Sequence, residues 1–492
     1  MIQHYPALVV ILPLCGAALS LALTKIHLHL GRNVIFLSMA LSFYMSIMQL
    51  RNVVINGPME YRFGGYAIPY SIEFRIDTVN GLVVAMVALM GLITAFYCIS
   101  GEIRSEKLKV GGAYAVVALF VAGMLGNASS ADAFNMYVFL EITALAAYCL
   151  IALGGNRGMV AAFRYMLVGT IAGTFYLLGV GILYSATGTL NMQDMSIIIQ
   201  QGGKDEAVLV ALCLMIAGLG IKSALFPFHG WQPSAHTHEE RGSAALIAGV
   251  MVKIPVYMLF RFVYCVFGTN FKYMQQILIV LGIFVGIGMM YGSIRAIGQT
   301  NMKKLLAYSS ITQTSYFMLG IVIGSPVALA GSLLHFIGDA FIKGGLFYCA
   351  GAIKYKFGTV NIDNFGRIYK KMPVTSALIV AGALSMIGIP PTVGFFSKWY
   401  IAMGAIQTGK YIFVILLIIS SLLNAIYFFK IIEKIFMSKD KGLEDVRPVK
   451  KGELPWSMLV PMSVCIVVIF LLGFLNVKII NMVLPLLKGV GM

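Results

Sequence analysis

The chain has 492 residues, of which 59% are hydrophobic and only 11% are charged, and its mean hydropathy is +0.89. This composition excludes a water-soluble protein, because apolar stretches long enough to cross a membrane recur from one end of the chain to the other. The formal net charge of +17 would indicate nucleic-acid binding in a soluble protein. No platform of basic and aromatic residues lies outside the apolar stretches, so no nucleic acid is expected.

Hydrophobic runs predict about fourteen transmembrane helices, each long enough for a hydrocarbon core of about 30 Å. In chain order the expected spans are 3–24, 31–50, 78–100, 111–129, 132–153, 159–187, 207–227, 243–267, 273–295, 301–324, 327–353, 374–408, 411–437 and 456–486. The predicted fold class is therefore an all-α polytopic membrane protein. One insertion, 51–77, alternates polar and apolar residues around a Gly-Gly turn, which predicts a small β-hairpin lying over one membrane face.

Lysine and arginine are distributed unequally between alternate loops. About twenty lie in one set of loops and about seven in the other, and the positive-inside rule places the richer set in the cytoplasm. Both termini are then predicted to lie outside. The seven cysteines are isolated and form no C-x-x-C pair, so neither a metal nor a cofactor is expected.

Seven ionisable residues lie well inside predicted spans, where a charge costs at least about 3 kcal/mol on insertion scales and indicates a functional site. They are Glu141, Lys222, Lys253, His335, Asp339, Lys343 and Lys398. A buried lysine can lose and regain a proton at working pH, because burial disfavours the charged form and a nearby carboxylate restores it. The pattern predicts an ion path.

The eleventh span places His335, Asp339 and Lys343 four residues apart, so the three side chains share one face of a helix. Such a stripe can pass a proton along the helix. The alternative is a buried ion pair between Asp339 and Lys343 that only fixes helix packing.

Glu141 lies in the middle of the fifth span with apolar flanks, so a basic partner is required, and Lys222 is the expected one. Two structural alternatives remain open. Glu141 is then a satisfied carboxylate without a transport role, and Lys222 and Lys253 are lysines near helix ends that reach the membrane interface.

Proline interrupts two spans. The seventh breaks at Pro227, five residues after Lys222, and the twelfth breaks at Pro390 and Pro391, about two turns before Lys398. A helix broken at membrane depth must lie beside protein or a water-filled cavity. Because the breaks are five spans apart, they predict two inverted five-helix repeats, spans 4–8 and 9–13. The predicted divisions are 1–110 for the first three spans, 111–267 and 268–437 for the repeats, and 438–492 for a cytoplasmic loop and the last span.

His229, His236, His238 and Glu239 follow the first break. Their spacing fits no standard zinc pattern, so an accessory role in proton entry or helix coupling is favoured over a metal site. The segment that opens the tenth span, from Asn301 onwards, needs only a topological explanation, with an N-cap followed by basic residues on the cytoplasmic side.

Four stretches of the chain resemble a known family, the antiporter-like subunits of respiratory complex I, of Mrp-type Na⁺/H⁺ antiporters and of membrane-bound hydrogenase-related complexes. The stretches are FLEITALAAY (139–148), KSALFPFHGWQPSAH (222–236), MKKLLAYSSITQTSY (302–316), and HFIGDAFIKGGLF (335–347) with GFFSKWY (394–400). The resemblance covers most of the chain, from about 61 to about 434, and implies a multi-pass protein of a prokaryotic plasma membrane.

The resemblance also implies roles for individual residues. Glu141 and Lys222 would form the charge pair of the first half-channel, Lys253 would be the connecting lysine, and Lys398 would be the terminal lysine on the exit side. His335 would continue a central polar axis.

Two departures distinguish the chain from its relatives. Asp339 stands where many members have a second histidine, and the turn THEERGSAA (237–245) replaces an Ala-Pro-rich one. The first departure leaves the proton preference of the central axis open, and we interpret the second as a mark of a specialised, hydrogenase-like or sulfur-reducing branch.

The expected function is ion translocation, of H⁺ or of H⁺ exchanged for Na⁺, within a multi-subunit respiratory complex. The chain is expected to have no catalytic centre and no cofactor of its own. Its expected partners are other membrane subunits, including further antiporter-like ones, peripheral redox subunits and the lipid bilayer. The alternatives are a subunit of an Mrp-type antiporter and a structural anchor or quinone-site subunit.

Overall fold

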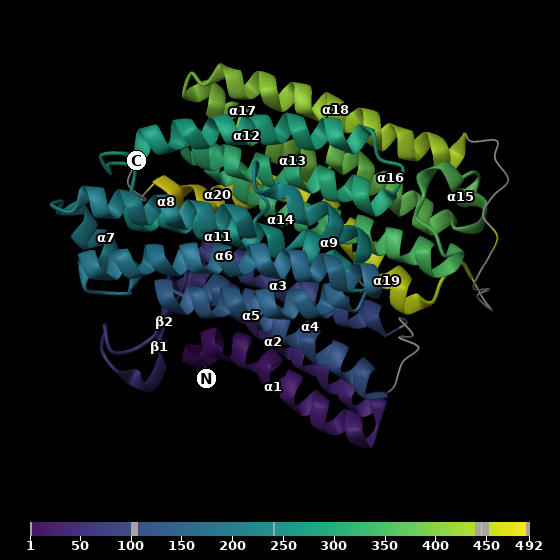
Figure 1. The fold of residues 1–492 in the computed structure, drawn as a ribbon, viewed down its shortest axis with the longest axis horizontal. Coiled ribbons are helices and arrows are strands. Elements are labelled where there is room, and N and C mark those ends of the chain that lie inside the picture. The colour runs from purple at the N-terminus through teal and green to yellow at the C-terminus, as the bar shows by residue number, and fades with distance from the viewer. Residues whose placement is uncertain (1, 100–106, 240–241, 438–443, 445–451, 489–492) are drawn as a thin grey trace.

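The computed structural model describes residues 2–99, 107–239, 242–437, 444 and 452–488, and in these residues the protein is built almost entirely of helices (Figure 1). The α-helices are α1 (Tyr5–Ile26), α2 (Leu28–Asn56), α3 (Thr78–Cys98), α4 (Lys107–Ser129), α5 (Ala133–Ala152), α6 (Asn156–Thr187), α7 (Met192–Gln200), α8 (Asp205–Lys222), α9 (Gln232–His238), α10 (Ala244–Gly249), α11 (Ile254–Arg261), α12 (Met274–Ile297), α13 (Met302–Ile323), α14 (Pro326–Phe357), α15 (Ile368–Lys371), α16 (Pro373–Ile387), α17 (Val393–Gln407), α18 (Tyr411–Phe436), α19 (Trp456–Phe474) and α20 (Asn476–Lys488). The predicted all-α class is confirmed.

The predicted spans correspond to these helices. Among the described residues, eleven helical segments are long and apolar enough to cross a membrane by length and composition. These are α1 to α6, the segment from α10 to the π-helical turn η5 (Phe262–Phe267), α12, α14, α18 and α19. The remaining predicted spans are α8, α13 and the pair α16 and α17, which are shorter, more polar or broken.

The predicted hairpin is present but shorter than 51–77, because α2 continues to Asn56. Strands β1 (Met59–Arg62) and β2 (Glu73–Ile76) pair antiparallel, with Met59 opposite Ile76. In Figure 1 the hairpin and α7 lie at one end of the helices and α15 at the other. We call these ends the hairpin side and the α15 side.

Two interruptions and one additional helix were not predicted. The eighth span is irregular from Gly249 to Ile254, where α10 ends, a 3₁₀ turn follows and α11 begins. Pro255, at the start of α11, was the sequence signal for this break. The last span divides at Leu475 into α19 and α20, and α7 is a short additional helix of nine residues.

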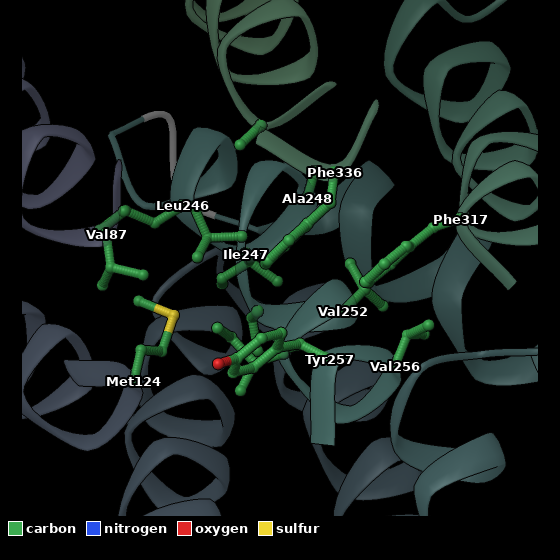
Figure 2. Packing of buried hydrophobic residues seen from close by; sticks show 14 of the residues in the cluster. Val87, Met124, Leu246, Ile247, Ala248, Val252, Val256, Tyr257, Phe317 and Phe336 are labelled. Carbon is green, nitrogen blue, oxygen red and sulfur yellow. The ribbon is translucent and has the colours of Figure 1, made fainter. Parts of the chain in front are cut away.

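The centre of the molecule is α14, whose membrane-length window is entirely buried, as is that of the α10–η5 segment. The Ser325 side chain accepts a hydrogen bond from the Ala328 amide and caps the start of α14, and Gly358 ends it in the left-handed conformation. Figure 2 shows the apolar packing around this centre, where Phe317 of α13 stacks on Phe336 of α14 at 4.9 Å between ring centroids. Outer helices such as α18 bury little and present apolar side chains outward.

Candidate functional site

The first ion pair joins Glu141 of α5 to Lys222, the last residue of α8. The Lys222 Nζ lies 3.0 Å from the Glu141 Oε1. The lysine side chain is 1% exposed and the glutamate side chain 26% exposed. The expected partnership is therefore present, and Lys222 does not extend to an interface.

The chain after Lys222 leaves helical geometry but remains tied to α8. The Trp231 Nε1 donates a hydrogen bond to the Ile221 carbonyl oxygen at 2.9 Å, and its ring stacks on Tyr165 of α6 at 3.8 Å. The Phe226–Pro227 peptide is cis. The break predicted at Pro227 is observed, and side-chain contacts cover the interrupted backbone, as broken helices at membrane depth require.

Gly173 of α6 provides the space that Glu141 occupies, and this predicts the effect of filling it. A Cβ atom built on Gly173 would lie 2.4 Å from the Glu141 Oε1, so we expect Gly173→Ala to displace the carboxylate from Lys222. We expect ion transport to fall about tenfold, because small misplacements of reacting groups are costly. The matched control is Gly181→Ala on the same helix, where nothing lies within 4 Å. Equal transport by the two variants would contradict the expectation.

The second ion pair joins the irregular eighth span to α14. The Lys253 Nζ lies 2.8 Å from the Asp339 Oδ2, and both side chains are at most 1% exposed. The same ammonium group donates a hydrogen bond to the Gly249 carbonyl oxygen at 2.5 Å. The alternative pairing of Asp339 with Lys343 is wrong, because a residue on the neighbouring element takes the carboxylate.

The remaining members of the α14 stripe bond to other helices. The Lys343 Nζ donates to the Leu306 carbonyl oxygen of α13 at 2.9 Å and to the Ser309 hydroxyl. The His335 Nδ1 lies 3.0 Å from the Ser397 Oγ of α17. The predicted shared face is thus real, and it contacts the eighth span, α13 and α17 in turn.

Lys398 is held by backbone oxygens at the second break. Its Nζ donates to the Met386 carbonyl oxygen at 2.8 Å and to the Ile387 carbonyl oxygen at 3.1 Å, at the end of α16. The Tyr316 ring centroid is 5.1 Å from the ammonium group. No carboxylate in the described part of the chain forms an ion pair with Lys398. The Pro390–Pro391 peptide of this break is cis.

The three elbow histidines point to different neighbours. His229 stacks on Phe226 and contacts the tilted ring of Tyr291, and the His238 Nδ1 lies 2.9 Å from the Ser234 carbonyl oxygen. His236 is fully buried, with its Nδ1 3.3 Å from the Glu239 Oε2. No group of three or more possible metal ligands occurs among the described residues, and residues 240–241 lie outside them.

The contribution of α13 to the site was not predicted from the sequence. Ser309 bonds to Lys343, and Tyr316 contacts both His335, at 5.5 Å between ring centroids, and Lys398. Lys303 is also buried, and its Nζ donates to the Glu239 carbonyl oxygen at 3.1 Å. The signal was available, because residues 309 and 316 are seven apart and share one face of a helix.

Comparison with known proteins identifies the family. A family model described as NADH:quinone oxidoreductase/Mrp antiporter, transmembrane, matches residues 130–424. The matched segment contains both ion pairs, the α14 stripe and Lys398. This chain belongs to that family. The resemblance predicted from the four sequence stretches is confirmed, and the protein is a multi-pass membrane protein.

The relatives span nearly the whole chain. Subunit N of the NADH-quinone oxidoreductase of Desulforudis audaxviator (strain MP104C) is 41% identical over 98% of both chains. A subunit of the Na⁺/H⁺ antiporter of Bacillus subtilis (strain 168) is 29% identical over 96% of this chain and 94% of its own. Members of the family with both kinds of name therefore align with this chain from end to end.

The fold is that of solved antiporter-like chains. A chain of the membrane-bound sulfane sulfur reductase, an archaeal respiratory membrane complex, has a TM-score of 0.89 and 25% identity over 99% of this chain and 97% of its own. A chain of the Mrp complex from Dietzia sp. DQ12-45-1b has a TM-score of 0.88 with the same coverage but 22% identity, which shows a shared fold only.

Proposed function

We propose that this chain is the ion-translocating subunit of a multi-subunit respiratory complex in a prokaryotic plasma membrane, and that the ion is H⁺. The observation that supports this most is the series of ionisable side chains inside the family segment, all of them buried except the partly exposed Glu141. It comprises Glu141 with Lys222, Lys253 with Asp339, and then Lys343, His335 and Lys398. Buried ionisable groups in membrane spans mark ion pathways.

The basic groups in this series outnumber the acidic ones, and the mechanism that we propose depends on this excess. The series contains four lysines and two carboxylates, and both carboxylates already have a lysine partner. A proton arriving at an unpaired lysine adds a charge to an apolar interior, which is costly unless a neighbour compensates. A change in one ion pair therefore changes the proton affinity of the next group, and protons move along the series without a cofactor.

The two breaks support the division into inverted repeats. We propose repeats at 111–267 and 268–437, in which α8 with α9 corresponds to α16 with α17. We place the hairpin side outside the cell, with both termini, since the α15 side has the richer set of basic residues in the sequence. The elbow residues His229, His236, His238 and Glu239 then lie on the path from the cytoplasm and have an accessory role in proton entry.

The proposed partners are other membrane subunits, further antiporter-like chains among them, and peripheral redox subunits whose electron transfer supplies the energy. The relative at 41% identity is named as a subunit of a respiratory oxidoreductase. The fold neighbour at 25% identity belongs to a respiratory sulfur reductase. Both names favour a redox-driven complex over an independent antiporter. We propose no catalytic centre in this chain.

A second candidate function is Na⁺/H⁺ exchange, because a relative at 29% identity is named as part of such an antiporter. Ion flux in sealed vesicles containing the native complex separates the two. For the first function we expect H⁺ uptake driven by the redox reaction and unchanged when Na⁺ is removed. Na⁺ movement opposite to H⁺ without redox turnover would assign exchange instead. Redox turnover without movement of either ion would leave the chain as a structural anchor.

A quinone-site subunit is the remaining alternative. An apolar pocket of about 370 Å³ lies between α8, the elbow and α12, lined among others by Cys213, Phe226 and Gln276. The described residues of its lining include no lysine, arginine, histidine or carboxylate to orient a quinone headgroup, and bound ligands are usually oriented by a few placed polar groups. The pocket does not favour quinone chemistry in this chain.

A further inference from the structure

Glu453 is not one of the ionisable groups of the series, yet its carboxylate bonds to α16, the helix whose last carbonyl oxygens accept from Lys398. Its Oε2 accepts a hydrogen bond from the Val374 amide at 2.9 Å, and its Oε1 accepts from the Thr375 amide at 2.8 Å and the Thr375 hydroxyl at 2.7 Å. Glu453 is 8% exposed. This buried carboxylate therefore accepts three hydrogen bonds from one helix end, and the bonded residue Thr375 lies 78 residues before it in the sequence.

The sequence of α16 explains why this contact is needed. The helix begins at Pro373, and Met372 at its N-cap position provides no side-chain hydrogen bond. The first amides of a helix have no partners within it and carry partial positive charge, so an anion placed there is stabilising. Glu453 supplies from another part of the chain the acceptors that a local N-cap residue would give.

Backbone contacts fix the segment that carries Glu453. The Lys356 Nζ, near the end of α14, donates to the Glu453 carbonyl oxygen and to the Lys371 carbonyl oxygen, both at 3.2 Å. Leu454 is buried beside it. The segment Gly452–Pro455 is thus attached to α14 and α16, and the same lysine of α14 also bonds to the end of α15.

The opposite end of α16 holds the lysine of the proposed path. The carbonyl oxygens of Met386 and Ile387 accept from the Lys398 Nζ, and the helix stops at Gly388, whose φ is +96°. A helix of fifteen residues is about 22 Å long and transmits a shift along its axis from one end to the other. The Glu453 carboxylate lies at the N-terminus of α16, where the helix dipole is positive, and the Lys398 ammonium lies at its C-terminus, where the dipole is negative.

We propose that Glu453 is a positioning residue for Lys398, holding α16 in the place where its last carbonyl oxygens bind the lysine ammonium group. The inference rests on the proposed function, because Lys398 matters only if it belongs to the ion path. Glu453 itself contacts no transported ion. It determines the position of the half-helix that does contact the relevant lysine.

The test compares Glu453→Gln with Glu433→Gln in the assembled complex. Glu433 is an exposed glutamate near the end of α18 on the same side. We expect the first substitution to lower ion transport about fivefold, because neutralising an anion at a helix N-terminus weakens all three contacts. The second should leave transport unchanged. Glu453→Asp should recover part of the loss, and the amount of protein in the membrane should be equal in all variants.

Amide hydrogen exchange at the far end of α16 is the second measurement. If Glu453 only capped the near end of the helix, its replacement would leave exchange at the far end unchanged. The amides of Gly388 and Ile389 bond to the Leu384 carbonyl oxygen at the far end of α16. We expect Glu453→Gln to raise exchange there as well as at Val374 and Thr375. Faster exchange only at the near end, or wild-type transport with faster exchange at both ends, overturns the inference. Unchanged transport by Lys398→Ala would overturn the proposed function itself, so the two failures are distinguishable.

Discussion

Replacing Lys222 with alanine should reduce ion translocation by the assembled complex about a hundredfold, the loss typical when one essential group is removed from a preorganised site. Its ammonium is the single partner of Glu141 among the described residues, at 3.0 Å. The measurement is ion flux in sealed vesicles under redox turnover. Lys434→Ala is the control, because Lys434 lies 31% exposed in a pair with Asp363 at 3.5 Å and surface pairs contribute little.

The same pair predicts an asymmetry in stability. Removing Glu141 as Glu141→Gln leaves a 1% exposed lysine without its anion, whereas removing Lys222 leaves a carboxylate that is 26% exposed. The first change should therefore destabilise the protein more, by about 3–5 kcal/mol if the lysine stays charged. Thermal unfolding of the purified complex measures the difference. Transport at the wild-type level in Lys222→Ala would show that the pair is only structural.

Replacing Asp339 with asparagine should be the most destabilising single change at the site. Lys253 would lose its anionic partner in a fully buried position and keep neutral acceptors such as the Gly249 carbonyl oxygen, and breaking a buried pair from one side costs about 3–5 kcal/mol. The double variant Lys253→Met with Asp339→Leu should recover most of this stability, since no charge is left unpaired. It should not recover transport.

The matched control for Asp339 is Asp363→Asn. Asp363 is 44% exposed and pairs with Lys434, so the change in stability should be below about 1 kcal/mol. A cost equal to that of Asp339→Asn would contradict the importance of burial. The variant Asp339→His places a histidine where many members of the family have one. It should transport more than Asp339→Leu, because a histidine can still pass a proton.

Much of the architecture follows from the sequence because the bilayer imposes a simple length rule. A run of apolar residues must be about twenty long to cross, so most predicted spans agree with the helices to within a few residues. The interruption of the eighth span before Pro255 was missed, because the apolar run on both sides of Lys253 is long enough for one continuous helix.

The site was only partly predictable. Ionisable residues are rare inside membrane spans because burying a charge there is energetically unfavourable. Every group in the series could therefore be found from its position in an apolar run. The contributions of Ser309 and Tyr316 were missed, because hydroxyl groups cost little in a helix and the spacing of two such residues is a weaker signal than a charge in an apolar run. Whether these two hydroxyl residues contribute to packing or to transport depends on the side chains opposite them, here Lys343 and Lys398.

The sequence by itself therefore indicated which apolar runs form helices, where two of them break, and seven of the charges that lie inside them. Only the tertiary structure decided the partners. Asp339 shares a helical face with Lys343 but pairs with Lys253, because helical spacing sets direction within one helix and neighbouring elements decide what lies opposite. Likewise Lys398 ends on two carbonyl oxygens, and Glu453 caps a helix that begins about eighty residues before it. Such contacts depend on how helices pack, and local sequence does not encode that packing.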